Sequence, residues 1–361
     1  MKHLSILTAI ILAAAALMAS FQNCYACTGI TLKAKVGSTV VARTIEWAAS
    51  DNDCRWVVVP RGHRWKSFIP GGGTGRSFTN EYGYVGVSVV QNELMMEGMN
   101  EKGLSAGLFY FPDYGKYEEY SESNYDTNIS DFQLVSYILG RCATVDEVKA
   151  EIARVHIHGF DPRSSTVHWR FAEPSGRQIV LEIIDGKCVF YENTLGVLTN
   201  SPSFDWQLTN LNNYVNLLPG RTEPHTIGNM SLSSFGGGSA MIGLPGDFTP
   251  PSRFVRAAFF QSTATQKPDA EGSVFTAFHI LGSMEIPIGA QFPVDETPAD
   301  IPSATQCTCV TDMSGLRFYY RSMYDGGIRC IDLKEIDFKK IGLKSEPLVP
   351  SKKEFVHHIR F

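Results

Sequence analysis

The sequence predicts an α+β protein in which two β-sheets pack together and helices lie outside them. Runs of β-branched residues bounded by glycine-containing turns predict strands near both ends of the chain and in its middle. Apolar residues at helical spacing occur in separate segments between these runs. Because strand runs and helix runs are segregated, a repeating β-α-β chain is excluded. No internal repeat or long low-complexity linker divides the chain, so we expect a single domain over residues 27–361.

The first half of this domain is predicted to be mainly strands, followed by two helices. The predicted strands cover residues 28–35, 39–44, 55–59, 83–90 and 103–111. Apolar spacing then predicts a helix over 131–140, and a capping-box pattern at 144–147 opens another over 145–155.

The second half alternates strand and helix blocks. Three strands joined by short turns form a predicted meander over residues 166–173, 178–185 and 188–192. Helices are predicted next, over residues 204–215, 253–262 and 274–284. The chain then returns to strands at residues 305–311, 316–322 and 328–333.

The composition is that of a folded globular protein. Of 361 residues, 43% are apolar and 19% are charged, which excludes disordered, collagen-like and coiled-coil chains. The net charge is −5 and no basic patch is present, so nucleic acid is not expected as a partner. Eight cysteines are too few for a disulfide scaffold in a chain of this length.

Residues 1–26 are predicted to be a secretory signal peptide. A basic start precedes an uncharged apolar run over residues 4–18, and the small Ala26 ends the segment. The run is shorter than the about 20 residues of a membrane anchor, and no later stretch is long enough to span, so we expect no anchor. A lipoprotein acylated at Cys24 is the alternative, although Cys24 lacks a small residue directly before it. Cleavage after Ala26 gives an exported protein, in a bacterial periplasm, that begins at Cys27.

Cys27 at a processed N-terminus is the sharpest chemical feature. A cysteine thiolate is a strong nucleophile but needs a base to take its proton. The α-amino group of the same residue titrates near pH 7.7–8.0, so one residue supplies both nucleophile and base. The alternative is a redox pair, because Cys24 and Cys27 form a C-x-x-C. A redox C-x-x-C belongs between a strand and a helix, whereas this one lies across a signal cleavage site.

Five segments together resemble the choloylglycine hydrolase family, which contains bile salt hydrolases and penicillin V acylases. They are residues 27–29 (CTG), 42–47 (ARTIEW), 99–104 (MNEKGL), 198–202 (LTNSP) and 243–254 (GLPGDFTPPSRF). They occur in order over nearly the whole mature chain. The resemblance implies a four-layer αββα sandwich of two antiparallel sheets, the fold of N-terminal-nucleophile hydrolases. It also implies amide hydrolysis without a cofactor or metal, and a homo-oligomer, often a tetramer.

Residue by residue, the resemblance assigns roles to five positions. Cys27 is the nucleophile, and Arg43 matches an arginine beside the thiol, where a cation favours the thiolate. Glu46 stands where the family usually has an aspartate that holds the terminal amine. Asn200 matches an asparagine that donates its side-chain amide to the oxyanion, and Arg253 matches a second arginine near the thiol.

Tyr110 marks a departure from the bile salt hydrolase pattern. Bile salt hydrolases usually carry Asn-Phe-Pro after Ala-Gly-Leu, whereas residues 106–112 read AGLFYFP, one residue longer. Penicillin V acylases tend to have tyrosine there, so we expect the second oxyanion donor to be a backbone N–H. Because the segments around Asn200 and 243–254 look most similar to bile salt hydrolases, we expect an amidase for glycine- or taurine-conjugated bile salts. A penicillin V acylase is the alternative on the same fold, and a periplasmic binding protein with an inert Cys27 is a distant one.

Three other patterns carry no function in this interpretation. Residues 71–75 (GGGTG) lack the ending of a phosphate loop and are predicted to form a flexible turn. His156 and His158 alternate along a strand, but no nearby cysteine or carboxylate completes a metal site. Cys307 and Cys309 lie in a predicted strand, where we expect their side chains to point apart and not to bond to each other.

Overall fold

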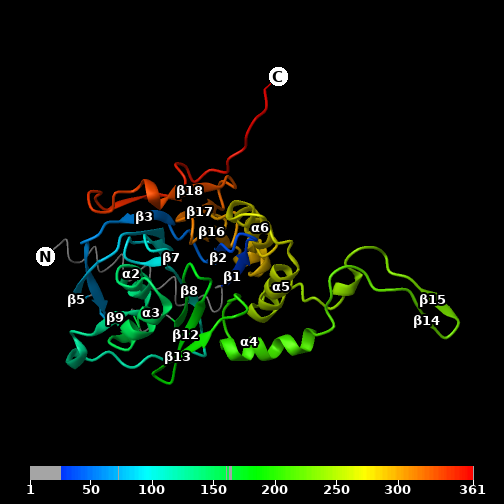
Figure 1. Ribbon diagram of the computed structural model, residues 1–361, viewed down its shortest axis with the longest axis horizontal. Coiled ribbons are helices and arrows are strands. Elements are labelled where there is room, and N and C mark those ends of the chain that lie inside the picture. The colour runs from blue at the N-terminus through cyan, green and yellow to red at the C-terminus, as the bar shows by residue number, and fades with distance from the viewer. Residues whose placement is uncertain (1–25, 72, 160, 162–164, 361) are drawn as a thin grey trace.

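The computed structural model describes residues 26–71, 73–159, 161 and 165–360, and two antiparallel sheets form its body (Figure 1). The smaller sheet has the order β1-β2-β16-β17-β18. Its strands are β1 (Cys27–Lys33), β2 (Thr39–Glu46), β16 (Thr305–Asp312), β17 (Arg317–Ser322) and β18 (Arg329–Asp332). Strand β16 therefore lies beside β2 although most of the chain separates them in sequence.

The larger sheet has the order β13-β12-β11-β8-β7-β6-β3-β19. In chain order its strands are β3 (Arg55–Val59), β6 (Tyr84–Ser88), β7 (Met95–Asn100), β8 (Ser105–Tyr110), β11 (Val167–Ala172), β12 (Gln178–Ile184), β13 (Lys187–Glu192) and β19 (Lys344–Pro347). Consecutive strands pair through most of it, and β11 joins β8 with Val167 opposite Tyr110.

Helices cover the outer face of each sheet. Helices α5 (Pro250–Thr263) and α6 (Ala270–Gly282) pack on the smaller sheet, and α2 (Leu134–Leu139) and α3 (Val145–Ile152) pack on the larger one. The predicted αββα sandwich is thereby confirmed. In the part of the chain that the structure describes, no helix is long and apolar enough to cross a membrane.

The remaining elements are short. They are the strands β4 (Arg64–Ile69), β5 (Gly73–Thr79), β9 (Asn128–Ser130), β10 (His156–His158), β14 (His225–Ile227) and β15 (Met230–Leu232), the helix α4 (Phe204–Asn210), and single 3-10 turns. The β14–β15 hairpin lies at the end of an arm, residues 215–245, that extends away from the body (Figure 1).

The alternation of strand β2 places side chains into two different cores. Val41 and Ile45 belong to the cluster between the sheets, whereas Val40 and Ala42 belong to the cluster beneath α5 and α6. Because successive side chains of a strand point to opposite faces, Arg43 shares the face of Val41 and Ile45. An arginine is thus placed in the apolar layer between the two sheets, where its charge requires partners.

Two sequence-based expectations are wrong. Residues 73–75 of the predicted flexible turn belong to β5, which pairs with β4. Cys307 and Cys309 do not point apart, because residues two apart in a strand share a face. Their sulfur atoms lie 3.4 Å from each other, and both cysteines are free, as predicted. The predicted signal peptide, apart from Ala26, lies outside the described residues.

Candidate active site

Cys27 is the first residue of β1 and is buried at 3% exposure. It pairs across the sheet with Ile45, and the neighbouring Thr28 amide donates to Thr44 Oγ1 at 3.1 Å. The turn between β1 and β2 contains Gly37, whose φ of 90° suits glycine. This hairpin brings the end of β2, with Arg43 and Glu46, beside the start of β1.

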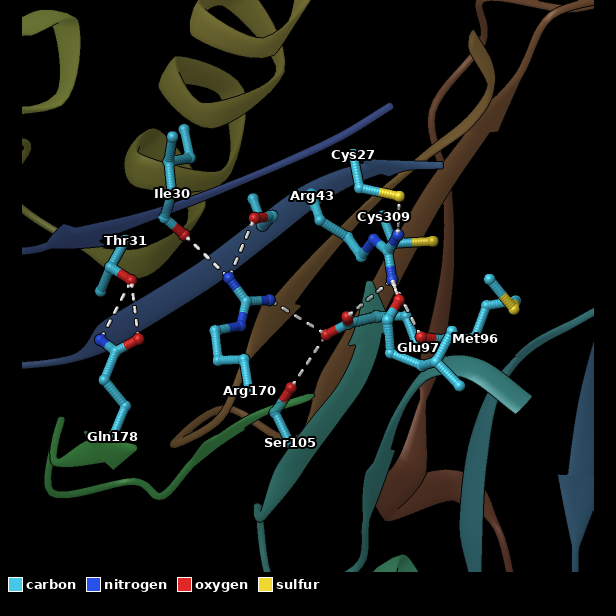
Figure 2. A network of polar contacts seen from close by, with 12 residues as sticks. Cys27, Ile30, Thr31, Arg43, Met96, Glu97, Ser105, Arg170, Gln178 and Cys309 are labelled. Atoms are coloured by element: carbon cyan, nitrogen blue, oxygen red, sulfur yellow. Dashed lines mark hydrogen bonds and ion pairs between the residues drawn. The ribbon is translucent and has the colours of Figure 1, made fainter. Parts of the chain in front are cut away.

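Arg43 is the cation at the thiol. Its Nη2 donates to Cys27 Sγ at 2.8 Å (Figure 2), and its guanidinium lies 4.1 Å from the ring centre of Phe109. Burial by itself lowers the pKa of Arg43, but the negative charges of Cys27 and Glu97 raise it overall. The guanidinium therefore stays charged, and a charged donor at sulfur favours the nucleophilic form of cysteine.

Carbonyl groups of the larger sheet fix the orientation of Arg43. Its Nη1 donates to Met96 O at 3.0 Å and to Leu108 O, while Nε donates to Thr44 O at 3.1 Å. These acceptors come from β7, β8 and β2 itself. Arg43 is thus held from both sheets, and its remaining Nη2 is directed at the sulfur.

Glu97 joins Arg43 to a second buried arginine (Figure 2). Its Oε1 lies 3.2 Å from Arg170 Nη2, and its Oε2 lies 3.9 Å from Arg43 Nη1. Ser105 Oγ donates to the same Oε1 at 3.2 Å. Arg170 also reaches the smaller sheet, because its Nη1 donates to Ala42 O at 3.3 Å. All three charged side chains are at most 1% exposed, so they form one inter-sheet charge network behind the thiol.

Asn200 contacts Cys27 through its side-chain oxygen. Oδ1 accepts from Cys27 N at 2.7 Å and from Arg253 Nη2 at 2.8 Å. Because both partners are donors, this assigns the oxygen and nitrogen of the amide. Nδ2 then donates to Tyr110 O at 2.7 Å, which leaves its second N–H for another acceptor.

Arg253 is buried in the first turn of α5 and reaches the backbone of Cys27. Its Nη1 donates to Cys27 O at 2.5 Å and to Thr28 Oγ1 at 2.8 Å, and its Nε donates to Phe248 O at 2.9 Å. Burial lowers the pKa of Arg253, with the charges of Glu46 and Cys27 acting in the opposite direction. The arginine therefore ties α5 to the first residue of β1.

Glu46 ends β2 as a buried carboxyl. Thr305 Oγ1 donates to its Oε1 at 3.2 Å, and its Oε2 makes no hydrogen bond with the described residues. Burial raises the pKa of Glu46 to about 7, although the charge of Arg253 and the Thr44 hydroxyl act in the opposite direction. The charges of Arg253 and Arg43 both act on this carboxyl, which counts it with the site, but Cys27 N donates to Asn200 and not to Glu46.

Tyr110 meets Asn200 through its backbone carbonyl, at the end of β8. Burial raises the pKa of its phenol, and a hydrogen bond with Ser165 opposes the shift. The side chain is partly exposed and packs against the core cluster that includes residues of α2 and α3, on the opposite face of β8 from Phe109. Only the backbone of Tyr110 therefore meets the site.

Five other cysteines are poorer candidates for the nucleophile. Burial raises the pKa of Cys54, Cys142, Cys188 and Cys330. The pKa of Cys307 is also raised, mainly by its contact with Cys309 and to a smaller extent by burial. A raised pKa leaves a smaller fraction of each thiol ionised, which disfavours the nucleophilic form. Within the described ranges, no group of three or more His, Cys, Asp or Glu side chains is arranged to hold a metal.

Sequence reasoning missed the residues that hold this site from the larger sheet. Glu97 and Arg170 were not singled out, nor was His168, which lies beneath the segment that carries Asn200. The available signal was a charged residue inside a strand whose neighbours are apolar on both sides, as at Arg170 between Trp169 and Phe171.

The two-sheet fold with a cysteine at the start of its first strand is that of the N-terminal-nucleophile hydrolases. A family model described as linear amide C–N hydrolases, choloylglycine hydrolase family, matches residues 27–346. The chain belongs to this family and is a linear amide C–N hydrolase.

Curated relatives carry two different activities. The bile salt hydrolase/transferase of Clostridium perfringens is 31% identical over 316 residues, covering 86% of this chain and 93% of that protein. The bile salt hydrolase/transferase of Lactiplantibacillus plantarum is 33% identical, covering 74% and 83%. The penicillin V acylase of Pectobacterium atrosepticum is 27% identical, covering 84% and 79%.

Solved structures have the same fold. Conjugated bile acid hydrolase from Clostridium perfringens superposes with a TM-score of 0.79 at 28% identity, covering 92% of this chain and 100% of that chain. Penicillin V acylase from Agrobacterium tumefaciens gives a TM-score of 0.71 at 24% identity, covering 92% and 94%. These likenesses establish the Ntn-hydrolase fold of the chain.

Proposed function

We propose that the protein hydrolyses the amide bond of glycine- and taurine-conjugated bile salts through a thioester on Cys27. The observation that carries the proposal is the contact of Arg43 Nη2 with Cys27 Sγ at 2.8 Å, with Asn200 bound to the nitrogen of the same cysteine. The bile salt hydrolases among the relatives support the substrate class, and this last step is an analogy.

The proposed reaction begins when removal of the preceding chain frees the Cys27 amine. That amine takes the thiol proton, and the thiolate attacks the amide carbon of the substrate. The carbonyl oxygen becomes an oxyanion, which receives hydrogen bonds from Asn200 Nδ2 and from a backbone N–H; one such donor contributes about 10²–10³ in rate. The amine product leaves with the proton from the Cys27 ammonium, and water then cleaves the thioester to the free acid. No cofactor or metal takes part.

Glu46 is the proposed partner of the Cys27 ammonium. Its Oε2 is buried without a hydrogen bond in the uncleaved chain, which is a costly state for a carboxyl. Cleavage creates a positive charge at the start of β1, close to the end of β2. An ion pair there satisfies the carboxyl and lowers the pKa of Glu46 below its value of about 7 in the uncleaved chain.

Export to the periplasm and assembly into a tetramer belong to the same proposal. The basic start and apolar run of residues 1–26 support export. The arm at 215–245 supports assembly, because an isolated hairpin of this kind is marginal unless another surface packs on it. Its exposed apolar side chains are Val215, Leu218, Ile227, Met230, Phe235 and Ile242. Light scattering on the mature protein tests this: the mass of four chains supports it, and the mass of one chain refutes it.

The test of function is amine release from taurocholate, glycocholate and penicillin V by the mature protein, with Cys27→Ala as the blank. Release from the bile salts alone is the expected result. Preference for penicillin V supports the alternative function, a penicillin V acylase, which Tyr110 and the Pectobacterium relative also favour. No release above the blank refutes both.

A second form of the protein distinguishes the proposed amidase from a binding protein with an inert Cys27. In that form Ala26 still precedes Cys27, so the amine is blocked. A binding protein retains ligand affinity in this form, whereas the proposed amidase loses turnover. Equal turnover by the blocked and mature forms contradicts the mechanism.

A further inference from the structure

The segment that carries Asn200 is held at both ends by a buried pair of side chains outside the site described above. His168 on β11 and Glu182 on β12 are both 0% exposed. His168 Nε2 lies 3.0 Å from Thr199 O, and its Nδ1 lies 3.1 Å from Glu182 Oε1. The same Oε1 accepts from Phe204 N at 2.9 Å, where α4 begins. The pair therefore binds the residue before Asn200 and the first residue of the next helix.

The hydrogen-bond partners assign the proton on His168. Thr199 O can only accept, so Nε2 carries a hydrogen and donates it. A second proton lies in the hydrogen bond between Nδ1 and Glu182 Oε1, on one of these two atoms. Both ring nitrogens are thus committed, and neither is available to act as a general base at the thiol.

Packing locks the imidazole in this orientation. The Phe111 ring stacks on it at 4.5 Å and 8°, and Phe109 meets it edge-on at 6.1 Å. The backbone on either side of Phe111 also receives donors from the Asn200 segment, because Asn200 Nδ2 donates to Tyr110 O and Ser201 Oγ donates to Pro112 O at 2.5 Å. The imidazole lies where the end of β8 meets residues 199–204.

We propose that His168, whose ring is oriented by Glu182, is a positioning residue for oxyanion stabilisation. It holds Thr199, and through it the amide of Asn200, in the orientation that directs an Nδ2 hydrogen at the reacting oxygen. This inference rests on the proposed function, because it takes Asn200 as the oxyanion donor. No contact joins His168 to Cys27, so it acts only through Asn200.

The chain offers a matched set of variants. His168→Asn places an amide near Nδ1 and loses the donor to Thr199 O, whereas His168→Gln places a donor near Nε2 and retains it. His156→Asn is the control, since that histidine also has two partners, Asn128 and Glu118, but lies on β10 outside the site.

The measurements are kcat and KM on the accepted bile salt, the inhibition constant of the C24 aldehyde of cholic acid, and the rate of Cys27 alkylation by iodoacetamide. The aldehyde adds the Cys27 sulfur to its carbonyl carbon, and its oxygen, as oxyanion or hydroxyl, occupies the oxyanion position. His168→Asn should lower kcat by about 10–100-fold and weaken the aldehyde in parallel, because a displaced donor loses part of the 10²–10³ that a deleted one loses. KM and the alkylation rate should stay within about twofold, and His168→Gln should recover most of kcat.

A merely structural role predicts another pattern and overturns the proposal. In that case kcat and the alkylation rate fall together while KM rises, or His168→Gln behaves like His168→Asn. A second test is the double variant that combines His168→Asn with Asn200→Ala. Its kcat should be less than about twofold below that of Asn200→Ala alone, because both substitutions act on the same oxyanion donor. Full additivity of the two losses in kcat refutes the inference.

If His168→Asn does not fold, Glu182→Gln replaces it as the test variant, because glutamine keeps an acceptor for Phe204 N. Glu182→Gln should lower kcat without changing the alkylation rate, and an unchanged kcat refutes the inference. A wild-type protein that hydrolyses no substrate refutes the proposed function instead.

Discussion

Replacing Glu97 by glutamine should destabilise the mature protein by about 3–5 kcal/mol, the usual result of breaking a buried charge pair on one side. The carboxylate lies 3.2 Å from Arg170 Nη2 and 3.9 Å from Arg43 Nη1. At the effective dielectric constant that suits proteins, each attraction is worth about 4 kcal/mol or somewhat more. Glutamine has a similar shape and can still accept from Ser105, so the change removes the charge with little change in packing.

The gross attraction overstates the effect, because the native carboxylate was itself desolvated at a cost of several kcal/mol. Glutamine avoids that cost, but it leaves two buried guanidinium groups without their shared anion. Since Arg43 and Arg170 are at most 1% exposed, water cannot replace the lost charge. The lost attraction, less the avoided desolvation cost, gives the expected net loss of about 3–5 kcal/mol in free energy of unfolding.

Urea unfolding at pH 7, followed by tryptophan fluorescence, measures the loss. The matched control is Glu192→Gln, which also removes a carboxylate that pairs with two cations, Arg177 and Lys149, but at a surface where the carboxylate is 46% exposed. The control should show a change several times smaller. Equal changes in the two variants would refute the reasoning, because burial would then contribute nothing to the strength of the network.

Three further predictions follow from the same geometry. Burial raises the pKa of Glu46 to about 7 from 4.5, so in a form that retains Ala26 the folded state binds more protons than the unfolded state between these pH values. Its free energy of unfolding should therefore fall as pH rises from 4.5 to 7, by up to about 3 kcal/mol, and Glu46→Gln should abolish the decline; a rise in urea midpoint over this interval contradicts the sign. Gly107→Ala should reproduce the effect of Glu97→Gln, since the added Cβ would lie 2.0 Å from Glu97 Oε2; an unchanged melting temperature would show that the carboxylate moves freely. Tyr110→Phe should leave kcat within about twofold, because the contact with Asn200 is made by the backbone carbonyl; a large loss of kcat would assign the hydroxyl a part in the reaction.

The fold was predictable from the sequence where local pattern and final environment agree. Strand β3 has the predicted bounds, Arg55–Val59, because its β-branched residues fit a buried strand. Helix α5 begins at Pro250, earlier than the predicted residue 253, and the two prolines at its start fit positions whose N–H groups need no helical partner.

Strand β7 shows why other elements were missed. Its sequence, MMEGMN, has no β-branched residue and contains a glutamate and a glycine. Gly98 is required there because a Cβ would lie 2.7 Å from Val85 O of the neighbouring strand. The strand therefore depends on tertiary pairing between β6 and β8, which a local propensity does not contain. The same holds for the position of β16 beside β2.

The candidate site divides in the same way. The resemblance named Cys27, Arg43, Asn200 and Arg253, and the structure joins these four through hydrogen bonds. Their catalytic roles stay predictions. The charges of both arginines act on Glu46, and its contact with a Cys27 amine, which the resemblance implies, stays a prediction.

The side chains that hold the site could not be found by motif because they come from the opposite sheet. Cys27, Arg43 and Glu46 lie on β1 and β2, whereas Glu97 and Arg170 lie on β7 and β11. A charge between two apolar sheets is stable only when its partners arrive from across the interface. The orientation of Arg43 toward the thiol is therefore a property of the packed sandwich and not of the β1–β2 hairpin. It follows that Cys27 acquires its cationic partner only when the two sheets have packed, so the environment of its thiol and the stability of the inter-sheet layer depend on the same contacts.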